Sequence, residues 1–386
     1  MSVKANWNYP TAIRFGAGRI AELADALKVA AIARPLLVTD PGIRDLPMLA
    51  AALRVLESAG RPAAVFSEVQ GNPVDRNVEA GVAAYRAGGH DGVIAFGGGS
   101  ALDVGKVVAF MVGQTRPMWD FEDIGDWWTR ADPEGIAPIV AVPTTSGTGS
   151  EVGRAGVITH SASHTKKVIF HPKMMPAVTI CDPELTVGLP PVLTAATGMD
   201  ALSHCLEAYC APGYHPMADG VAVEGMRLVK ENLARAVADG TDIEARGHMM
   251  SAAAMGATAF QKGLGGMHAL SHPVGALYNT HHGMTNAVFM PYVLAFNDAA
   301  IADRMARLAR WLGLATHSTA GVIDWVLRLR DEVGVPHTLA GLNVDGARIE
   351  EIAAAAEVDP CAGGNPVPFD RAAARRVFAA ALDGKL

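Results

Sequence analysis

The first half of the chain alternates short, almost uniformly apolar runs with longer runs whose apolar residues recur every three or four positions. Runs of the first kind predict strands buried on both faces, and runs of the second kind predict helices. Between Phe15 and about Pro183 this alternation predicts a parallel sheet covered by helices, a Rossmann-like α/β domain. The expected strands are 34–40, 62–66, 92–96 and 138–142, and the expected helices are 48–58, 78–85 and 102–112.

Beyond Pro183 the strand pattern stops and helical periodicity continues to the C-terminus. Prolines cluster at this break, at positions 176, 183, 190 and 191, so we expect an α/β domain over residues 1–185 and an all-helical domain over residues 186–386. Asp345 and Thr319 stand at positions typical of helix N-termini. The expected helices are 193–210, 218–237, 244–261, 265–278, 300–312, 320–333, 349–356 and 371–382.

Size and charge agree with a two-domain globular protein. At 386 residues the chain exceeds the size at which one core usually divides, and half of its residues are hydrophobic while 18% are charged. The formal net charge is −7 and the Lys and Arg residues are dispersed, which argues against nucleic acid or an anionic membrane as the partner.

Cysteine usage and the first ten residues indicate the compartment. The four cysteines form no CxxC pair, and MSVKANWNYP lacks the charged head and apolar core of a leader. No apolar run approaches the roughly 20 residues of a membrane helix. The sequence therefore predicts a cytoplasmic protein without a disulfide framework.

Polar residues in two apolar helical segments form a candidate metal site. Asp200 and His204 are four residues apart and share a helix face, and His268 and His272 repeat that spacing before His281 and His282. Such a pair is often a solvated or capping pair, but these segments are rich in Ala, Leu, Gly and Met, so unpaired imidazoles would be costly there. One carboxylate with two or three imidazoles suits a divalent first-row ion. A zinc-protease site is excluded, because Ala269 stands where HExxH requires Glu.

Two glycine-rich runs follow expected strands in the first domain. Gly97, Gly98 and Gly99 lie between a strand and a helix, where backbone N–H groups and the helix dipole favour a phosphate. Neither a P-loop nor GxGxxG fits, and a purely structural tight turn remains the alternative. The second run, VPTTSGTGSEV, offers hydroxyls to a nucleotide. Asp40 ends the first expected strand, where a carboxylate can bind a ribose diol and favours NAD over NADP, or can form an Asx-turn.

Four motifs in order carry a resemblance to a known family: GGGSALDVGK, PTTSGTGSEV, GMDALSHCLEAY and HALSHPVGALYNTHHGMTNA. Together they closely resemble the iron-containing (group III) alcohol dehydrogenases, and the similarity covers essentially the whole chain. The resemblance implies the dehydroquinate synthase-like fold of that family: an N-terminal dinucleotide-binding domain and an all-helical domain, with cofactor and metal meeting in a cleft. It also implies a homo-oligomer, a dimer or larger.

Site residues follow from the resemblance position by position. It implies NAD and Fe²⁺ as cofactors, with Zn²⁺, Mn²⁺ or Ni²⁺ as alternatives at the metal. The implied metal ligands are Asp200, His204, His268 and His282, and His272 matches a neighbouring histidine that could relay a proton. The implied cofactor contacts are Asp40, Asn72, Gly97, Gly98, Gly99, Ser100, Asp103, Thr144, Thr145, Thr148 and Lys166.

Two departures from the family pattern are visible. Gly153 stands where many members carry Thr, which indicates a locally roomier or differently shaped substrate pocket, and Val367 stands where Arg is common. The complete ligand set argues against the maleylacetate-specific branch, which lacks it.

We therefore expect reversible oxidation of a small primary alcohol to an aldehyde with NAD, with His272 or water carrying the proton. His281 is expected to be structural. Two alternatives stay open: an NAD- and metal-dependent lyase of the dehydroquinate synthase type, and a non-enzymatic metal-binding protein, which would leave the glycine-rich loops unexplained.

Overall fold

The computed structural model describes residues 10–163 and 165–386, so the prediction about the first residues of the chain lies outside the described part. The chain divides into two compact units. The described residues up to Thr145, with Gly149–Gly188, form an α/β unit, while Ser146–Thr148 group with Leu189–Leu386 in a helical unit.

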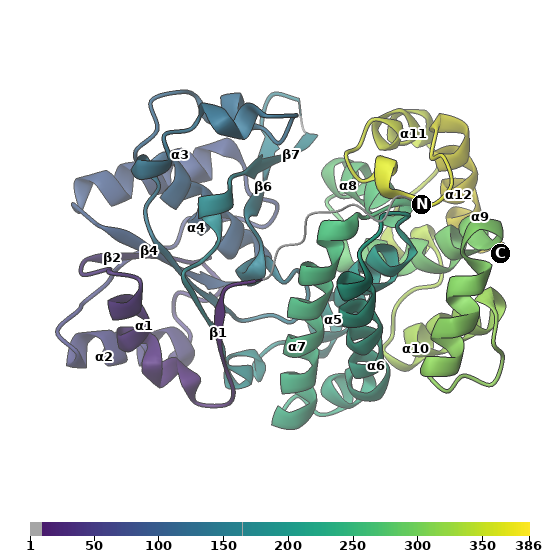
Figure 1. Cartoon of the computed structure of the whole chain (residues 1–386), viewed down its shortest axis with the longest axis horizontal. Helices are drawn as coiled ribbons and strands as arrows, with labels where there is room; N and C mark the ends of the chain where they lie inside the picture. Colours follow the sequence, from purple (N-terminus) through teal and green to yellow (C-terminus); the bar gives the residue numbers. More distant parts are fainter. Residues whose placement is uncertain (1–9, 164) are drawn as a thin grey trace. The chain divides into compact units, whose positions relative to one another are not determined.

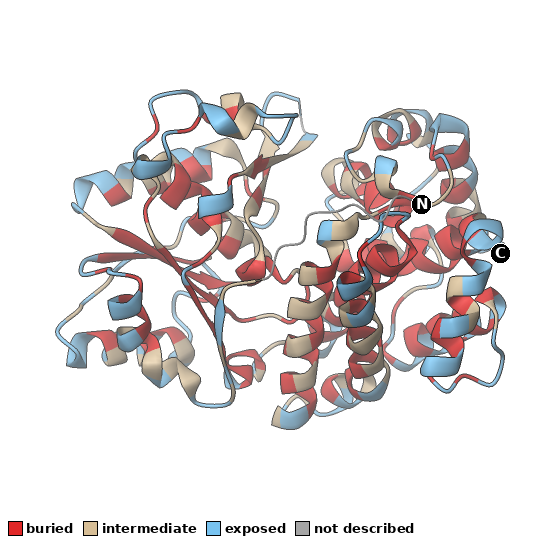
Figure 2. Ribbon diagram, in the orientation of Figure 1, coloured by how far each residue is buried: buried red, intermediate tan, exposed pale blue. Residues whose placement is uncertain are grey.

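The α/β unit contains a six-stranded, fully parallel sheet in the order β1-β8-β5-β4-β2-β3 (Figure 1). Central strands are buried on both faces, which explains their continuous apolar sequence (Figure 2). The strands are β1 (Ala12–Phe15), β2 (Pro35–Val38), β3 (Ala64–Phe66), β4 (Gly92–Gly97), β5 (Ile139–Pro143) and β8 (Val178–Cys181).

Helices cover both faces of this sheet. Successive β4 residues point to opposite faces, so Val93 and Ala95 pack with α3 (Asp75–Ala87) and α4 (Gly99–Met111). Ile94 and Phe96 pack with α1 and α2 on the other face. Those two helices span Leu23–Val29 and Pro47–Ser58. An antiparallel hairpin, which the sequence pattern did not predict, adds β6 (Ala155–His160) and β7 (Thr165–Phe170).

The helical unit is organised around α5 (Pro191–Cys210), on which α6, α7 and α9 pack. Nearly every α5 residue from Thr194 onward is buried, as expected of a helix enclosed on all sides. The remaining helices are α6 (Pro216–Ala238), α7 (Ile243–Ala259), α8 (Gly266–Tyr278), α9 (His282–Trp311), α10 (Thr319–Glu332), α11 (Ile349–Glu357) and α12 (Arg371–Asp383).

The structure corrects the expected start of α9 and the expected N-terminal residues of α10 (Thr319–Glu332) and α11 (Ile349–Glu357). Helix α9 begins at His282, eighteen residues before the expected start at 300. The N-cap of α10 is Ser318, whose side chain accepts from the Gly321 N–H, so Thr319 is the first helical residue. Asp345 accepts from the Ala347 N–H in the turn before α11 and does not cap the helix.

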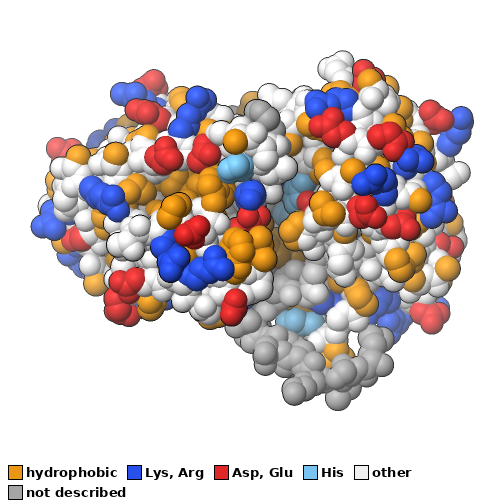
Figure 3. Space-filling view, turned by 90° about the horizontal axis from the view of Figure 1, so that it is seen from above, with side chains coloured by type: hydrophobic (Ala, Val, Ile, Leu, Met, Phe, Trp, Pro, Cys, Tyr) orange, Lys and Arg blue, Asp and Glu red, His pale blue; other side chains and the backbone are white. Residues whose placement is uncertain are grey.

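Within the described ranges every helix is too short or too polar to cross a bilayer. On the face shown in Figure 3, Lys and Arg side chains are interspersed with Asp and Glu, which agrees with the dispersed charge of the sequence.

A buried ionic cluster fixes the loop that follows β5. The Lys106 ammonium on α4, only 1% exposed, donates to the carbonyl oxygens of Ser150 (2.9 Å) and Ala155 and lies 3.5 Å from Asp103. Glu151 is buried beside it, and this burial raises the pKa of Glu151 to about 7 although the Lys106 charge opposes the shift. The folded protein thus holds a proton that the unfolded chain releases in mild acid.

Glu151→Gln should therefore flatten the pH dependence of stability. The stability contributed by protonated Glu151 is complete below about pH 4 and is lost as pH rises toward 7, in total about 3 kcal/mol for a pKa raised to about 7. Glutamine cannot ionise, so denaturant midpoints measured by tryptophan fluorescence between pH 4 and 8 should decline less in the variant. Parallel profiles for the two proteins would show that Glu151 does not titrate in this range.

Candidate functional site

Helix α5 presents Asp200, His204 and Glu207 at i, i+4 and i+7, on one face of a rigid, buried helix. The three residues are 2%, 5% and 4% exposed, so each polar group needs a partner inside the protein. The predicted shared face of Asp200 and His204 is therefore present.

Helix α8 adds His268, and Glu207 orients it. The Glu207 carboxylate accepts hydrogen bonds from His268 Nδ1 (2.7 Å) and from the backbone N–H groups of Gly265 (2.9 Å) and Met267 (2.6 Å). Because Nδ1 is occupied, the lone pair of His268 is on Nε2. Glu207 thereby fixes both the ring and its tautomer.

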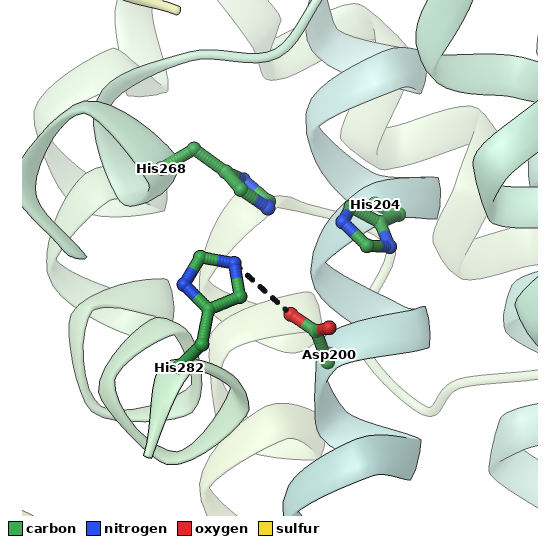
Figure 4. Close-up of side chains that lie close together, drawn as sticks. All are labelled: Asp200, His204, His268 and His282. Carbon is green, nitrogen blue, oxygen red and sulfur yellow. Dashed lines mark ion pairs between the residues drawn. The ribbon is translucent and has the colours of Figure 1, made fainter. Parts of the chain in front are cut away.

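The first turn of α9 supplies His282, with His281 as the N-cap residue. The His282 Nε2 atom lies 3.7 Å from Asp200 Oδ1, and the two side chains face each other in Figure 4. Asn286, one turn later, places its Nδ2 atom 2.9 Å from Asp200 Oδ1, 3.1 Å from His282 Nε2 and 3.2 Å from His268 Nε2.

Two glycines let the helices approach closely at these residues. A methyl group at Gly283 would lie 2.1 Å from the Ala196 carbonyl oxygen and 2.9 Å from Asp200 Cβ. One at Gly256 on α7 would lie 2.9 Å from His204 Cβ. Close packing of α5 with α7 and α9 therefore occurs where the polar side chains gather.

The geometry of this set fits a divalent cation. One ligand atom from each of Asp200, His204, His268 and His282 lies within 4.8 Å of the others, in the arrangement of Figure 4. The Asn286 amide has two N–H donors for three converging acceptors, so lone pairs remain that a cation would satisfy. Burial lowers the pKa of His204 to about 4, which keeps it in the neutral form that binds metals.

His272 lies beside the set but is turned to another partner. Its ring stacks on His282 at 5.5 Å between centroids, and its Nδ1 atom lies 2.8 Å from Asp359 Oδ2. Asp359 Oδ1 accepts from the Cys361 N–H at 2.8 Å, so the carboxylate is held at both oxygens.

In the α/β unit the triple-glycine turn lies at a switch in sheet topology. The chain leaves β2 toward β3 on one side and leaves β4 toward β5 on the other, and ligands of open α/β sheets bind at the strand ends beside such a point. Gly97 has φ of 146° and Gly98 is the N-cap residue of α4, so the turn presents backbone N–H groups at a helix N-terminus.

Asp40 forms the predicted Asx-turn and also borders this glycine turn. Its Oδ1 atom accepts from the Gly42 (2.9 Å) and Ile43 (3.1 Å) N–H groups. Its Oδ2 atom lies 3.4 Å from where a Gly97 Cβ would be, and burial raises the pKa of the carboxyl group. One oxygen is thus structural and the other faces the glycine turn.

The other predicted cofactor residues are distributed over both units. Thr144 N–H donates to the Gly97 carbonyl (3.0 Å), and Thr145 lies against Gly98. Asp103 accepts from Ser150 Oγ (2.5 Å) and the Val157 N–H (3.0 Å), so both of its oxygens have protein partners. The remaining positions are Ser100 within α4, Asn72 between β3 and α3, Lys166 on β7, and Thr148 in the segment grouped with the helical unit.

Two sequence profiles together match most of the chain. One described as iron-containing alcohol dehydrogenase matches residues 10–183, and one described as the C-terminal part of the Fe-containing alcohol dehydrogenase family matches residues 194–382. The chain belongs to the iron-containing alcohol dehydrogenase family. The predicted resemblance is confirmed, and the family implies NAD and a divalent metal, usually iron.

Individual relatives agree over nearly the full length. The chain is 40% identical to a 4-hydroxybutyrate dehydrogenase of Cupriavidus necator, across 96% of this chain and 98% of that protein. It is 36% identical to an NAD-dependent methanol dehydrogenase of Bacillus methanolicus, across 94% and 95%. The crystal structure of a 1,3-propanediol oxidoreductase superposes with a TM-score of 0.93 at 34% identity, across 98% and 100%, and confirms the predicted fold class. These relatives are alcohol and diol dehydrogenases, which does not favour the lyase alternative.

Sequence reasoning missed three residues that contact the predicted ligands or His272. Glu207 follows His204 by three positions and Asn286 follows His282 by four, so helical spacing could have found both. Asp359 reaches His272 from the turn after α11, and no local sequence signal pairs them.

Glu207→Gln should weaken metal binding. Two of the three N–H donors, on Gly265 and His268, share one carboxylate oxygen, and the third, on Met267, uses the other. A Gln amide keeps one acceptor oxygen and cannot accept from all three, which disturbs the orientation of His268, and loss of such a partner typically costs 10–100-fold in metal affinity. Equilibrium dialysis of Fe²⁺ under anaerobic conditions measures the change. Glu231→Gln, at an exposed position on α6, is the matched control, and equal Fe²⁺ affinity in both folded variants would contradict the orienting role.

Proposed function

We propose that this protein is a metal-dependent, NAD(H)-linked alcohol dehydrogenase that interconverts a small primary alcohol and its aldehyde. The convergence of Asp200 with three imidazoles in the helical unit is the observation that carries the proposal. The family, whose named members here are dehydrogenases, supports the same reaction class.

Asp200, His204, His268 and His282 would hold the cation, with Fe²⁺ proposed and Zn²⁺, Mn²⁺ or Ni²⁺ as alternatives. When bound, such an ion acts as a Lewis acid toward a substrate oxygen. The chain contributes a dry, preorganised setting, because three of the four residues are at most 5% exposed and Glu207 fixes His268.

His272 is proposed to move the proton. The Asp359 carboxylate accepts the Nδ1 proton of His272, which leaves Nε2 as the basic nitrogen. Its side chain is 20% exposed, so a proton taken up there can pass to solvent. His281 occupies the N-cap position of α9, where its carbonyl oxygen accepts from the Thr285 N–H, and it stays a structural residue in this proposal.

NAD is proposed to bind the α/β unit, with its pyrophosphate at the Gly97–Gly98–Gly99 turn before α4. Asp40 would contact the ribose diol and disfavour a 2′-phosphate. Asn72, Ser100, Asp103, Thr144, Thr145, Thr148 and Lys166 remain predicted contacts. The name of the Bacillus methanolicus relative, an NAD-dependent enzyme, supports the preference.

The names of two relatives indicate a class of substrate. One is named for methanol and another for 4-hydroxybutyrate, and both compounds are unbranched primary alcohols. We propose a short, unbranched primary alcohol, and Gly153 is consistent with a roomier pocket than a Thr-bearing member would have. A cytoplasmic location and a homo-oligomer of two or more subunits are also proposed, from the family resemblance. Neither nucleic acid nor a membrane is proposed as a partner.

Purified protein loaded with Fe²⁺ should reduce short aldehydes with NADH, lose this activity on chelation and regain it with Fe²⁺. His268→Ala should lower kcat/KM by more than about 100-fold, since loss of an outer partner alone costs 10–100-fold. NADH absorbance across a panel of methanol, 1,3-propanediol, 4-hydroxybutyrate and their aldehydes provides the measurement. His317→Ala, at an exposed position, should behave as wild type. Full turnover by stripped His268→Ala protein would refute the metal role.

Asp40→Asn and Asp40→Gly should both improve use of NADP. Each removes a charge near the predicted 2′-phosphate position, worth about 1–3 kcal/mol or roughly 5–150-fold in kcat/KM. Asparagine keeps an oxygen that can accept from the Gly42 and Ile43 N–H groups. Asp40→Asn therefore removes the charge and keeps the turn, whereas Asp40→Gly removes both. Unchanged NADP/NAD ratios in both variants would remove Asp40 from the cofactor site.

A further inference from the structure

A second group of potential ligands lies beside the Asp200 set. His272 on α8 meets Asp359 and Cys361, which follow α11, and one ligand atom from each of the three lies within 4.8 Å of the others. In a tetrahedral site with bonds of about 2.0–2.3 Å, ligand atoms lie about 3.3–3.8 Å apart, so small side-chain rotations would close this group on one ion.

The donors of this group differ from those of the first set. It contains a thiol, which favours soft cations such as Zn²⁺ and Cd²⁺ over Mg²⁺ and Ca²⁺. All four cysteines lie in the described part of the chain; Cys181, Cys205 and Cys210 are buried, whereas the residue Cys361 is partly exposed although its thiol is enclosed by protein. Of the four sulfurs, that of Cys361 therefore lies in the residue nearest to solvent.

Access and preorganisation both favour binding. The His272 and Asp359 side chains are 20% and 11% exposed, so a cation can approach them from solvent. Asp359 is held at one oxygen by the Cys361 N–H and at the other by His272, so the three residues already converge.

Other chemistry of this thiol is disfavoured. Burial and the neighbouring Asp359 raise the pKa of the Cys361 thiol well above its usual range, so it is not a reactive thiolate at neutral pH. A metal ion can still displace the thiol proton, because a coordinating thiol is deprotonated outright.

We propose that His272, Asp359 and Cys361 form an inhibitory site for a thiophilic divalent cation, separate from the Asp200 set. As the sulfur–cation bond forms, the thiol releases its proton to solvent, the imidazole binds as a neutral ring, and nothing is oxidised or reduced. The occupied site withdraws His272 from proton transfer. The inhibitory effect rests on the proposed function, whereas cation binding does not.

Titration of the metal-stripped protein with Cd²⁺, followed by the ultraviolet absorption of the cadmium–thiolate bond, tests the binding. The Asp200 set contains no sulfur, so this band reports the second site alone. Wild type should show one saturable band, and Cys361→Ser and Cys361→Ala should lose it. The backbone N–H that holds Asp359 remains in both variants. Cys205→Ala, at a buried position, is the matched control and should keep the band. A band retained in both Cys361 variants, or missing in wild type, overturns the site.

Two further arms separate this proposal from the proposed function. His282→Ala should lose dehydrogenase activity and keep the cadmium band, because its defect lies in the other set. With Fe²⁺-loaded protein, Zn²⁺ should inhibit wild type at concentrations at least tenfold lower than those needed for Cys361→Ser, while Mg²⁺ should inhibit neither. Equal Zn²⁺ sensitivity of the two proteins would overturn the inhibitory role.

Discussion

The helical unit depends on one buried anion, the carboxylate of Glu207. It accepts three hydrogen bonds from residues 265–268, some sixty positions along the chain, and thereby joins α5 to the start of α8. An unpaired carboxylate at this depth would be strongly destabilising, so folding places the two helices in the one register that satisfies it. Asn365 joins the C-terminal region to the same helix start, because its Oδ1 atom accepts from the Gly266 N–H (3.1 Å). His268 is thus positioned by backbone contacts as well as by its own helix.

The alternation of apolar runs predicted the class of the sheet, its four strands β2 to β5 and most helices, because burial and periodicity are both local signals, but it did not predict β1, β8 or α1. It failed at the start of α9 for a physical reason. Residues Gly283 to Leu294 are buried on every side, so they show no amphipathic period, and Pro291 resembles a helix end. The β6–β7 hairpin was also missed, since its burial alternates only partly and its pairing is antiparallel within an otherwise parallel unit.

The candidate site was predictable to the extent that it is helical. Spacing places Asp200 with His204 on one face, but it cannot say that His282 approaches Asp200, because the direction of a second helix depends on packing. The family resemblance supplied that step. Asp359 illustrates what remained beyond reach: its contact with His272 spans 87 positions and depends on where α11 ends.

The two proposed binding sites use different parts of the chain. The α/β unit offers backbone N–H groups at a glycine turn, which needs one strand–helix junction. The proposed metal site in the helical unit needs four side chains at one point. One helix can direct only a few side chains to the same point, so α5, α8 and α9 all contribute. Their approach is limited by backbone contact. The Cβ atom of any other residue at position 283 would lie 2.1 Å from the Ala196 carbonyl oxygen. Helix α9 would then have to move away from α5, and His282 would move away from Asp200. The glycine next to the histidine is therefore as necessary to the geometry as the histidine itself.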